Sequence, residues 1–192
     1  MQIQKEEVKQ NIINAAMEEF LTAGYSKSSL RVIASHAGIT VGNIYSYFHN
    51  KEELFETIVL PTVGRIKGLI LMKLSTNNTI TETSAMEVTK QIMALFNDNH
   101  NGFLILMNSA KGSKYENIRS VIQDQIKARL ILDLMPQLHV KRENEILADT
   151  LSLVLLEGII NIVMKSKNEE VMMNKLICEF LILVFGDIAE RL

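Results

Sequence analysis

Residues 24–51 carry the side chains with the clearest potential for chemistry. This stretch of 28 residues contains no Asp or Glu, whereas 22 acids in 192 residues would predict about three. The same stretch holds five basic or titratable cations: Lys27, Arg31, His36, His49 and Lys51. Chance could remove three acids, but the layout of the stretch, a helix, a glycine turn and a second helix, argues against chance. The pattern favours a surface that approaches the phosphates of a nucleic acid, although the net charge of −2 argues neither way.

Two short helices must position these groups. Ser28 and Ser29 can cap a helix over Leu30–His36, and Thr40 can cap a second helix over Val41–Tyr47. Gly38 supplies the sharp turn between them, with Ile39 filling the space that the helices enclose. This is the layout of a helix-turn-helix, whose second helix enters the DNA major groove with its N-terminus first.

The residue types along the second helix suit base reading. Asn43 can pair bidentately with adenine, and Val41 can contact a thymine methyl group. Uncharged hydroxyls for phosphate contacts come from Thr40, Tyr45, Ser46 and Tyr47. Asn50 can cap a further helix from Lys51, with Glu53 at the capping-box position, and the free amides of that helix start form a phosphate site.

These residues also carry a family resemblance. The matching positions are Gly24-Tyr25, Ser28-Ser29, Ile33-Ala34, Ala37-Gly38-Ile39-Thr40, Gly42, Tyr45, Tyr47-Phe48, Lys51 and Leu54. In order and spacing they resemble the N-terminal DNA-binding domain of TetR-type transcriptional repressors, over about residues 5–58. The family more often has threonines where this chain has Ser28-Ser29, but the hydroxyl is retained.

The resemblance implies a role for each matching residue. Phosphate contacts fall to Ser29, Tyr47 and Lys51, and the groove-facing positions are Thr40, Val41, Gly42, Asn43 and Tyr45. Ile44 and Phe48 are expected in the core. Arg31 fits a phosphate contact and a solvated helix face equally well, whereas His36 and His49 fit exposed helix ends better than phosphate contacts.

The whole chain is expected to be all-α, with about nine helices. Two prolines in 192 residues favour long helices, and no segment alternates with the two-residue period of a strand. Beyond the head, helices are expected over Lys51 onward with a kink at Pro61, then Ile80–Phe96, Phe103–Ala110, Tyr115–Leu134, Glu143–Lys165 and Glu169–Leu192. Polar breaks are expected at Ser75–Thr79, Asn97–Gly102 and Lys111–Lys114. The domains are expected at 1–50, for DNA binding, and 51–192, for effector binding and dimerisation.

The second domain is expected to form a homodimer and to bind a small molecule. Leu151–Met164 and Leu176–Phe185 are apolar on nearly all sides, and pairing each with its copy in a second chain would bury them. An apolar or weakly cationic effector could lie among the residues Met72, Met93, Phe96, Phe103, Met107 and Glu157. Ordinary core filling also explains those methionines, and Glu157 could instead bond across the dimer or lie at a wet edge.

The sequence argues against several other classes. Four histidines and one cysteine show no metal-ligand spacing, and no phosphate-cradling loop or nucleophile elbow occurs, so we expect no enzyme, metal or cofactor. A polar start, a lone Cys178 and apolar runs below about 18 residues indicate a cytoplasmic protein outside the membrane. The leading interpretation is a homodimeric repressor released from a palindromic operator by its effector. The alternatives are a small-molecule-sequestering protein with a vestigial head and an architectural DNA-binder without an effector.

Overall fold

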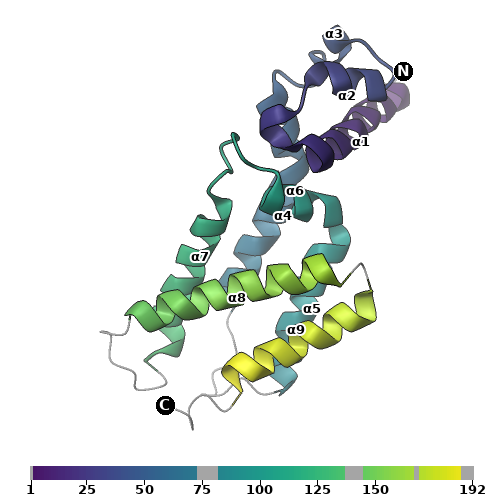
Figure 1. Cartoon of the computed structure of the whole chain (residues 1–192). Coiled ribbons are helices and arrows are strands. Elements are labelled where there is room, and N and C mark those ends of the chain that lie inside the picture. The colour runs from purple at the N-terminus through teal and green to yellow at the C-terminus, as the bar shows by residue number, and fades with distance from the viewer. Residues whose placement is uncertain (1, 73–81, 137–144, 167–168, 187–192) are drawn as a thin grey trace. The chain divides into compact units, whose positions relative to one another are not determined.

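Helices form all of the regular structure that the described residues contain. A computed structural model of the chain describes residues 2–72, 82–136, 145–166 and 169–186. Within these ranges the order is α1 (Gln2–Lys27), α2 (Leu30–His36), α3 (Val41–Ile44), α4 (Lys51–Leu71), α5 (Glu82–Asp98), α6 (His100–Asn108), α7 (Ile118–Arg129), a π-helical turn η1 (Leu130–Leu134), α8 (Glu145–Lys165) and α9 (Glu170–Phe185). The all-α prediction, with nine α-helices in the described part of the chain, is confirmed (Figure 1).

By packing, the chain divides into two units that are not the predicted domains. Unit 1 contains Met1–Arg65 and Phe96–Ile118, and unit 2 contains Ile66–Leu95 and Arg119–Leu192. The division therefore falls inside α4 and α5 rather than between residues 50 and 51. The functional boundary at 50/51 stays a prediction.

Unit 1 has an aromatic core that joins α1 to α4. The Phe55 ring packs edge-on against Phe20 at 5.1 Å and against Tyr25 at 4.9 Å between ring centroids. Phe20 and Phe55 are fully buried, and Ile12 and Ala16 of α1 join them in the core. Helix α1 breaks at Gly24, as predicted, because its φ of 74° favours a residue without a side chain. A rigid hydrophobic base therefore supports the short helices α2 and α3.

Helix α4 continues through Pro61 instead of restarting there, so the predicted break is wrong. Proline removes one main-chain donor from the ladder of the helix, but packing on either side can hold such a helix together. Ile58, Val59, Thr62 and Val63 are all buried around it.

The predicted loop at Asn97–Gly102 is wrong as well, because Asn99 alone separates α5 from α6. Its Oδ1 accepts from the amide of Gly102 at 3.2 Å, which caps α6. Its Nδ2 donates to the Ile58 carbonyl at 3.2 Å and to Thr62 Oγ1 at 3.0 Å. One amide side chain therefore makes the turn and ties it to α4.

The helix predicted over Tyr115–Leu134 divides into three parts. Tyr115 lies in a turn, since the Ser113 hydroxyl accepts its amide at 3.0 Å. Helix α7 follows, and η1 ends with the Met135 amide on the Leu130 carbonyl at 2.9 Å, just before Pro136. The predicted break at Ser75–Thr79 and the ends of the last two predicted helices lie outside the described residues.

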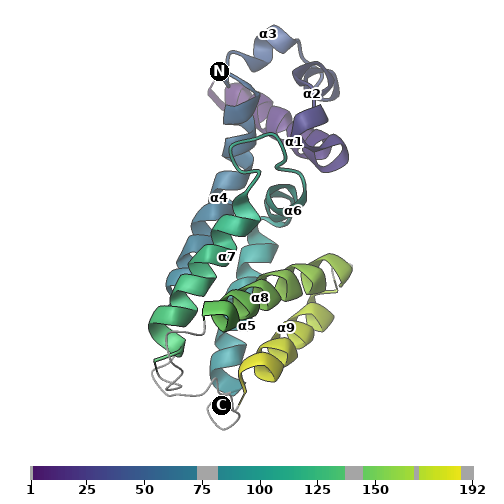
Figure 2. The ribbon, with the colours of Figure 1, turned by 60° about the vertical axis from the view of Figure 1, so that its left-hand side comes forward.

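In unit 2, α8 and α9 pack side by side, as both ribbon views show (Figures 1 and 2). Gly158 permits the close approach, because a Cβ at that position would collide with the Phe180 ring. One side of each helix is buried, through Leu155, Leu156, Ile160 and Val163 on α8 and Met173, Ile177, Leu181 and Phe185 on α9. Large apolar side chains nevertheless remain exposed on both helices.

Helix α8 is longer than its apolar run suggested. It has 21 residues, and its best 18-residue window has a mean hydropathy of 1.9 with 33% of that window buried. By length and composition alone it could cross a membrane, contrary to the sequence expectation. A helix buried against a partner subunit has the same composition.

Candidate DNA-binding site

The first helix of the predicted helix-turn-helix starts at a well-formed cap. Ser29 is the N-cap of α2, and its Oγ accepts from the amide of Arg31 at 3.2 Å. The Ser29 amide itself donates to Glu19 Oε1 on α1 at 3.1 Å. Ile33 and Ala34 are buried against the rest of the head, while Arg31 is exposed. The predicted span Leu30–His36 is confirmed.

The turn between α2 and α3 is built from main-chain bonds. Gly38 has a φ of 68°, the left-handed conformation that favours glycine, and Ile39 donates to the Ala34 carbonyl at 3.0 Å. Thr40 then caps α3, and its Oγ1 accepts from the amide of Asn43 at 3.3 Å. The same hydroxyl was predicted to face the DNA groove, so a DNA contact would have to share it with the cap.

Helix α3 is shorter than predicted. It covers Val41–Ile44, and Tyr45–Tyr47 continue as a tight turn in which the Ser46 and Tyr47 amides donate to the carbonyls three residues earlier, at 3.1 and 2.9 Å. Such three-residue bonds are common where a short helix ends. The predicted recognition helix is thus one turn of α-helix followed by a tighter turn.

The two sides of α3 differ in the way that a recognition helix requires. Ile44 and Phe48 are buried, as predicted. Gly42, Asn43 and Tyr45 are exposed, with Tyr45 at 54%. Val41 and Tyr47 are half-buried. Asn43 and Tyr45 therefore stand on an anchored element with their polar groups directed to solvent.

The structure gives Lys51 a set of contacts that the sequence did not suggest. Its Nζ donates to the carbonyls of Tyr25 at 2.7 Å and Ser28 at 3.0 Å, and it lies 4.3 Å from the centroid of the Tyr25 ring. Burial lowers the pKa of this ammonium, and the carboxylates of Glu52 and Glu19 partly offset the effect. The predicted phosphate contact stays a prediction, since the cation already has these acceptors.

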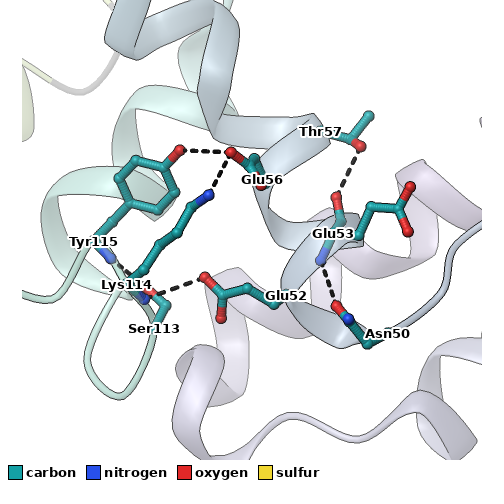
Figure 3. A network of polar contacts seen from close by, with 8 residues as sticks. All are labelled: Asn50, Glu52, Glu53, Glu56, Thr57, Ser113, Lys114 and Tyr115. Atoms are coloured by element: carbon teal, nitrogen blue, oxygen red, sulfur yellow. Dashed lines mark hydrogen bonds and ion pairs between the residues drawn. The ribbon is translucent and has the colours of Figure 1, made fainter.

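The start of α4 carries the predicted capping box. The Glu53 amide donates to Asn50 Oδ1 at 2.8 Å, and the His49 amide donates to Glu53 Oε2 at 2.6 Å. Figure 3 shows the first of these bonds. A carboxylate therefore lies at the helix start where a phosphate was expected, and the two negative groups would repel each other.

A polar network on the other side of α4 was not anticipated (Figure 3). The Lys114 amide donates to Glu52 Oε1 at 3.1 Å, its Nζ pairs with Glu56, and the Tyr115 hydroxyl donates to Glu56 Oε1 at 3.2 Å. The ion pair lowers the pKa of Glu56 and raises that of Lys114. Burial and a bond to Glu52 raise the pKa of Tyr25 to about 12. No sequence pattern links residues 52–56 to 113–115, so this docking of a loop on α4 could not be foreseen.

The residues predicted to line an effector site fall into both packing units. In unit 1, Phe96 and Phe103 are buried and meet edge-on at 6.0 Å, and Met107 is buried nearby in sequence. In unit 2, Met93 is buried and Met72 is half-buried. These residues have the apolar environment that the prediction required, and the site itself stays a prediction.

Glu157 has a specific partner. Both of its carboxylate oxygens accept from Arg119 Nη1, at 3.0 and 2.9 Å, which joins α7 to α8. A carboxylate paired in this way offers little to a cationic ligand. In the described part of the chain, no group of three His, Cys, Asp or Glu side chains could hold a metal ion.

Comparison with known proteins gives the same outline. A profile described as "Bacterial regulatory proteins, tetR family" matches residues 12–58. The chain is 30% identical over 131 residues to the fatty acid metabolism regulator protein of Bacillus subtilis, which is 68% of this chain and 66% of that protein. The alignment thus covers slightly less than two thirds of the relative's length.

Solved structures resemble the fold over nearly the whole chain. A TetR family member from Streptomyces coelicolor superposes with a TM-score of 0.68 at 18% identity, covering 91% of this chain and 89% of that one. The regulator FadR from Bacillus subtilis, in complex with stearoyl-CoA, gives 0.60 at 21% identity, covering 94% and 99%. At these identities the likeness concerns the fold.

Proposed function

We propose that this chain, which belongs to the TetR family of bacterial transcriptional regulators, is a homodimeric repressor that leaves a palindromic operator when it binds a small apolar effector. The observation that carries the DNA-binding part is α3. Its buried side, Ile44 and Phe48, anchors it, and its exposed side presents Asn43 and Tyr45 from a stretch without acids. The family consists of regulators and not of enzymes, so binding is the activity to explain.

In this proposal the head divides base reading from phosphate contact. Val41, Gly42 and Asn43 lie at the start of α3, where small side chains let the backbone approach base edges. Asn43 reads adenine, while Ser29, Arg31, Thr40, Tyr45 and Tyr47 supply donors to phosphates and the groove wall. Operator access to chromosomal DNA places the regulator in the cytoplasm.

A homodimer follows from the exposed apolar sides of α8 and α9. Leu153, Val154 and Met164 on α8 are 42–46% exposed, and Val171 and Leu183 on α9 are 86% and 71% exposed. A second copy packed on these faces by two-fold symmetry buries them in a four-helix seam. Two recognition helices are then held about 34–36 Å apart, one turn of DNA.

The effector is proposed to be a long-chain acyl thioester. Two supports carry this choice: the similarity to a fatty acid metabolism regulator, and a similar fold solved with stearoyl-CoA. The apolar residues Met93, Phe96, Phe103 and Met107 suit an acyl chain. The Arg119–Glu157 pair argues against the cationic ligand that the sequence left open.

Selection of bound duplexes from a random pool tests the DNA-binding proposal. We expect a palindromic consensus with half-sites about 10 base pairs apart. No enrichment of any sequence would overturn it and would favour the alternative of a sequestering protein with a vestigial head.

Titration of the operator complex with stearoyl-CoA, coenzyme A and stearate tests the effector. We expect release by the acyl thioester, with a coupling of about 1–3 kcal/mol between ligand and DNA, and no release by coenzyme A. Operator binding that no acyl compound changes would contradict the effector and favour an architectural DNA-binder.

A further inference from the structure

The side chain of Lys51 turns back from the first turn of α4 to the end of α1. Its ammonium donates to the Tyr25 carbonyl at 2.7 Å and the Ser28 carbonyl at 3.0 Å. It also lies over the Tyr25 ring, 4.3 Å from the centroid. A cation at the carbonyl end of a helix is favoured by the helix dipole, and an aromatic face adds to the attraction. One charge therefore holds both ends of the short segment Tyr25–Ser28.

Tyr25 is fixed from the other side by unit 1 itself. Its amide donates to the Ser109 carbonyl at the end of α6, at 2.8 Å, across the break that Gly24 makes. Its ring packs against Phe55, and its carbonyl also accepts from Ser28 Oγ at 2.7 Å. The segment that Lys51 holds is thus attached to a rigid base and not to a free loop.

The same segment leads directly into the reading elements. Ser28 precedes Ser29, the N-cap of α2, and α2 leads into α3 through the tight turn at Gly38. The Ile33 amide donates to the Ser29 carbonyl at 3.0 Å, so the first turn of α2 continues from the held segment. A rotation at Ser28 would therefore turn both helices together.

We propose that Lys51 is a positioning residue for operator reading: its ammonium locks the junction of α1 and α2, so that α3 presents Asn43 and Tyr45 in register, and it does not serve as a phosphate contact. This inference rests on the proposed DNA binding. To reach a phosphate, Nζ would have to give up acceptors inside the protein, and the Ser28 carbonyl would lose this donor.

Affinity measurements on the full-length regulator separate positioning from phosphate contact. Lys51→Met is compared with wild type and with Lys27→Met, which removes an exposed lysine of the same head. Binding to the selected operator and to a scrambled duplex is measured across a salt series. Positioning predicts that Lys51→Met loses about tenfold in discrimination between the two duplexes, the range of one misplaced base contact, with an unchanged salt slope on the scrambled duplex.

A phosphate contact predicts a different result, which would overturn the proposal. Both duplexes would then weaken equally, and the salt slope would fall by about 0.9 for each phosphate lost. A purely structural role would also overturn it, since the melting temperature would fall while the folded protein kept its discrimination. Lys27→Met is expected to keep discrimination in every case.

Lys51→Arg decides the question if Lys51→Met does not fold. Arginine keeps the charge that a phosphate needs, but its planar guanidinium does not replace a compact ammonium between two carbonyls and a ring. Positioning predicts a loss of discrimination in Lys51→Arg as well, whereas a phosphate contact predicts none.

Amide hydrogen exchange of the DNA-free protein provides an arm that does not depend on an operator. Positioning predicts exchange at Ile33 and Ala37 that is at least about tenfold faster in Lys51→Met than in Lys27→Met, with the middle of α1 unchanged. Equal exchange in the two variants would overturn the proposal. If wild type enriches no duplex, the proposed function fails while the exchange result still decides the role of Lys51.

Discussion

The DNA-binding head and the pair α8–α9 place their apolar residues in opposite ways. In the head, Phe20, Ile33, Ile44 and Phe55 are buried, and the exposed side of α3 is mostly polar or small. On α8 and α9, apolar side chains as large as Val171 and Leu183 are left mostly exposed after the helices have packed on each other. The difference teaches that the head is complete as a single chain, whereas α8–α9 still has surface that a second copy would cover.

The largest effect is expected from a charge placed inside the packed side of α8. Leu155 is only 8% exposed, so Leu155→Arg buries an unpaired charge and should lower the free energy of unfolding by on the order of 3–5 kcal/mol. Urea denaturation followed by circular dichroism measures the change. Near-wild-type stability would show that this side of α8 is not a core.

Leu183→Arg on α9 is the matched change on the exposed side. Leu183 is 71% exposed, so the charge stays in water in a single chain and the fold should survive. We expect a folded monomer in sedimentation at micromolar concentration, where wild type is a dimer, and weakened operator binding. A Leu183→Arg protein that still sediments as a dimer would place the seam elsewhere.

Asn43→Ala tests the reading side of the head. Loss of a bidentate adenine contact should cost about 1–3 kcal/mol of operator binding per half-site and relax specificity at one position. The exposure of Asn43 predicts no change in melting temperature. Repeating the selection with Asn43→Ala checks the claim, and an unchanged consensus would refute the assignment of this residue.

Ser29→Ala should have a smaller effect on stability, because Ser29 caps α2 with a bond to the Arg31 amide. Loss of an N-cap costs about 1 kcal/mol. Thermal unfolding of Ser29→Ala measures the loss, with Ser46→Ala, an exposed serine beyond α3, as the control. Equal stability of the two variants would mean that the cap contributes nothing.

The smallest expected effect concerns alkaline pH. The pKa of Tyr25 is raised to about 12 in the folded head, above the ordinary value of 10.0, so the folded state holds this proton more tightly. Its contribution is fully present below pH 10 and is lost as the pH rises toward 12. An ultraviolet titration of tyrosinate should lose its last phase in Tyr25→Phe. A titration that keeps that phase would assign the raised pKa to another tyrosine.

Local signals explain what the sequence could predict. Gly24, Ser29, Gly38, Thr40 and Asn50 act on their own neighbours, and each began or ended a helix where expected. The recognition surface was readable for the same reason. The errors arose where distant residues decide the outcome: Asn99 reaches α4 and replaces a loop, and packing carries α4 through Pro61.

The contacts of Lys51 and Lys114 were hidden from the sequence for the same physical reason. Lys51 finds its acceptors 23 and 26 residues earlier, and Lys114 finds Glu56 58 residues earlier. A charge in a helix start looks the same in sequence whether it faces DNA or turns back into the head. Only the fold distinguishes the two.

Operator affinity as a function of half-site spacing tests the central claim most directly, namely that α8–α9 holds two complete heads at a fixed separation. The account predicts that wild type loses most of its affinity when about 5 base pairs are inserted between the half-sites, because this places them on opposite faces of the duplex. Leu183→Arg should bind every spacing equally and weakly. Wild-type binding that is indifferent to the spacing would contradict the account.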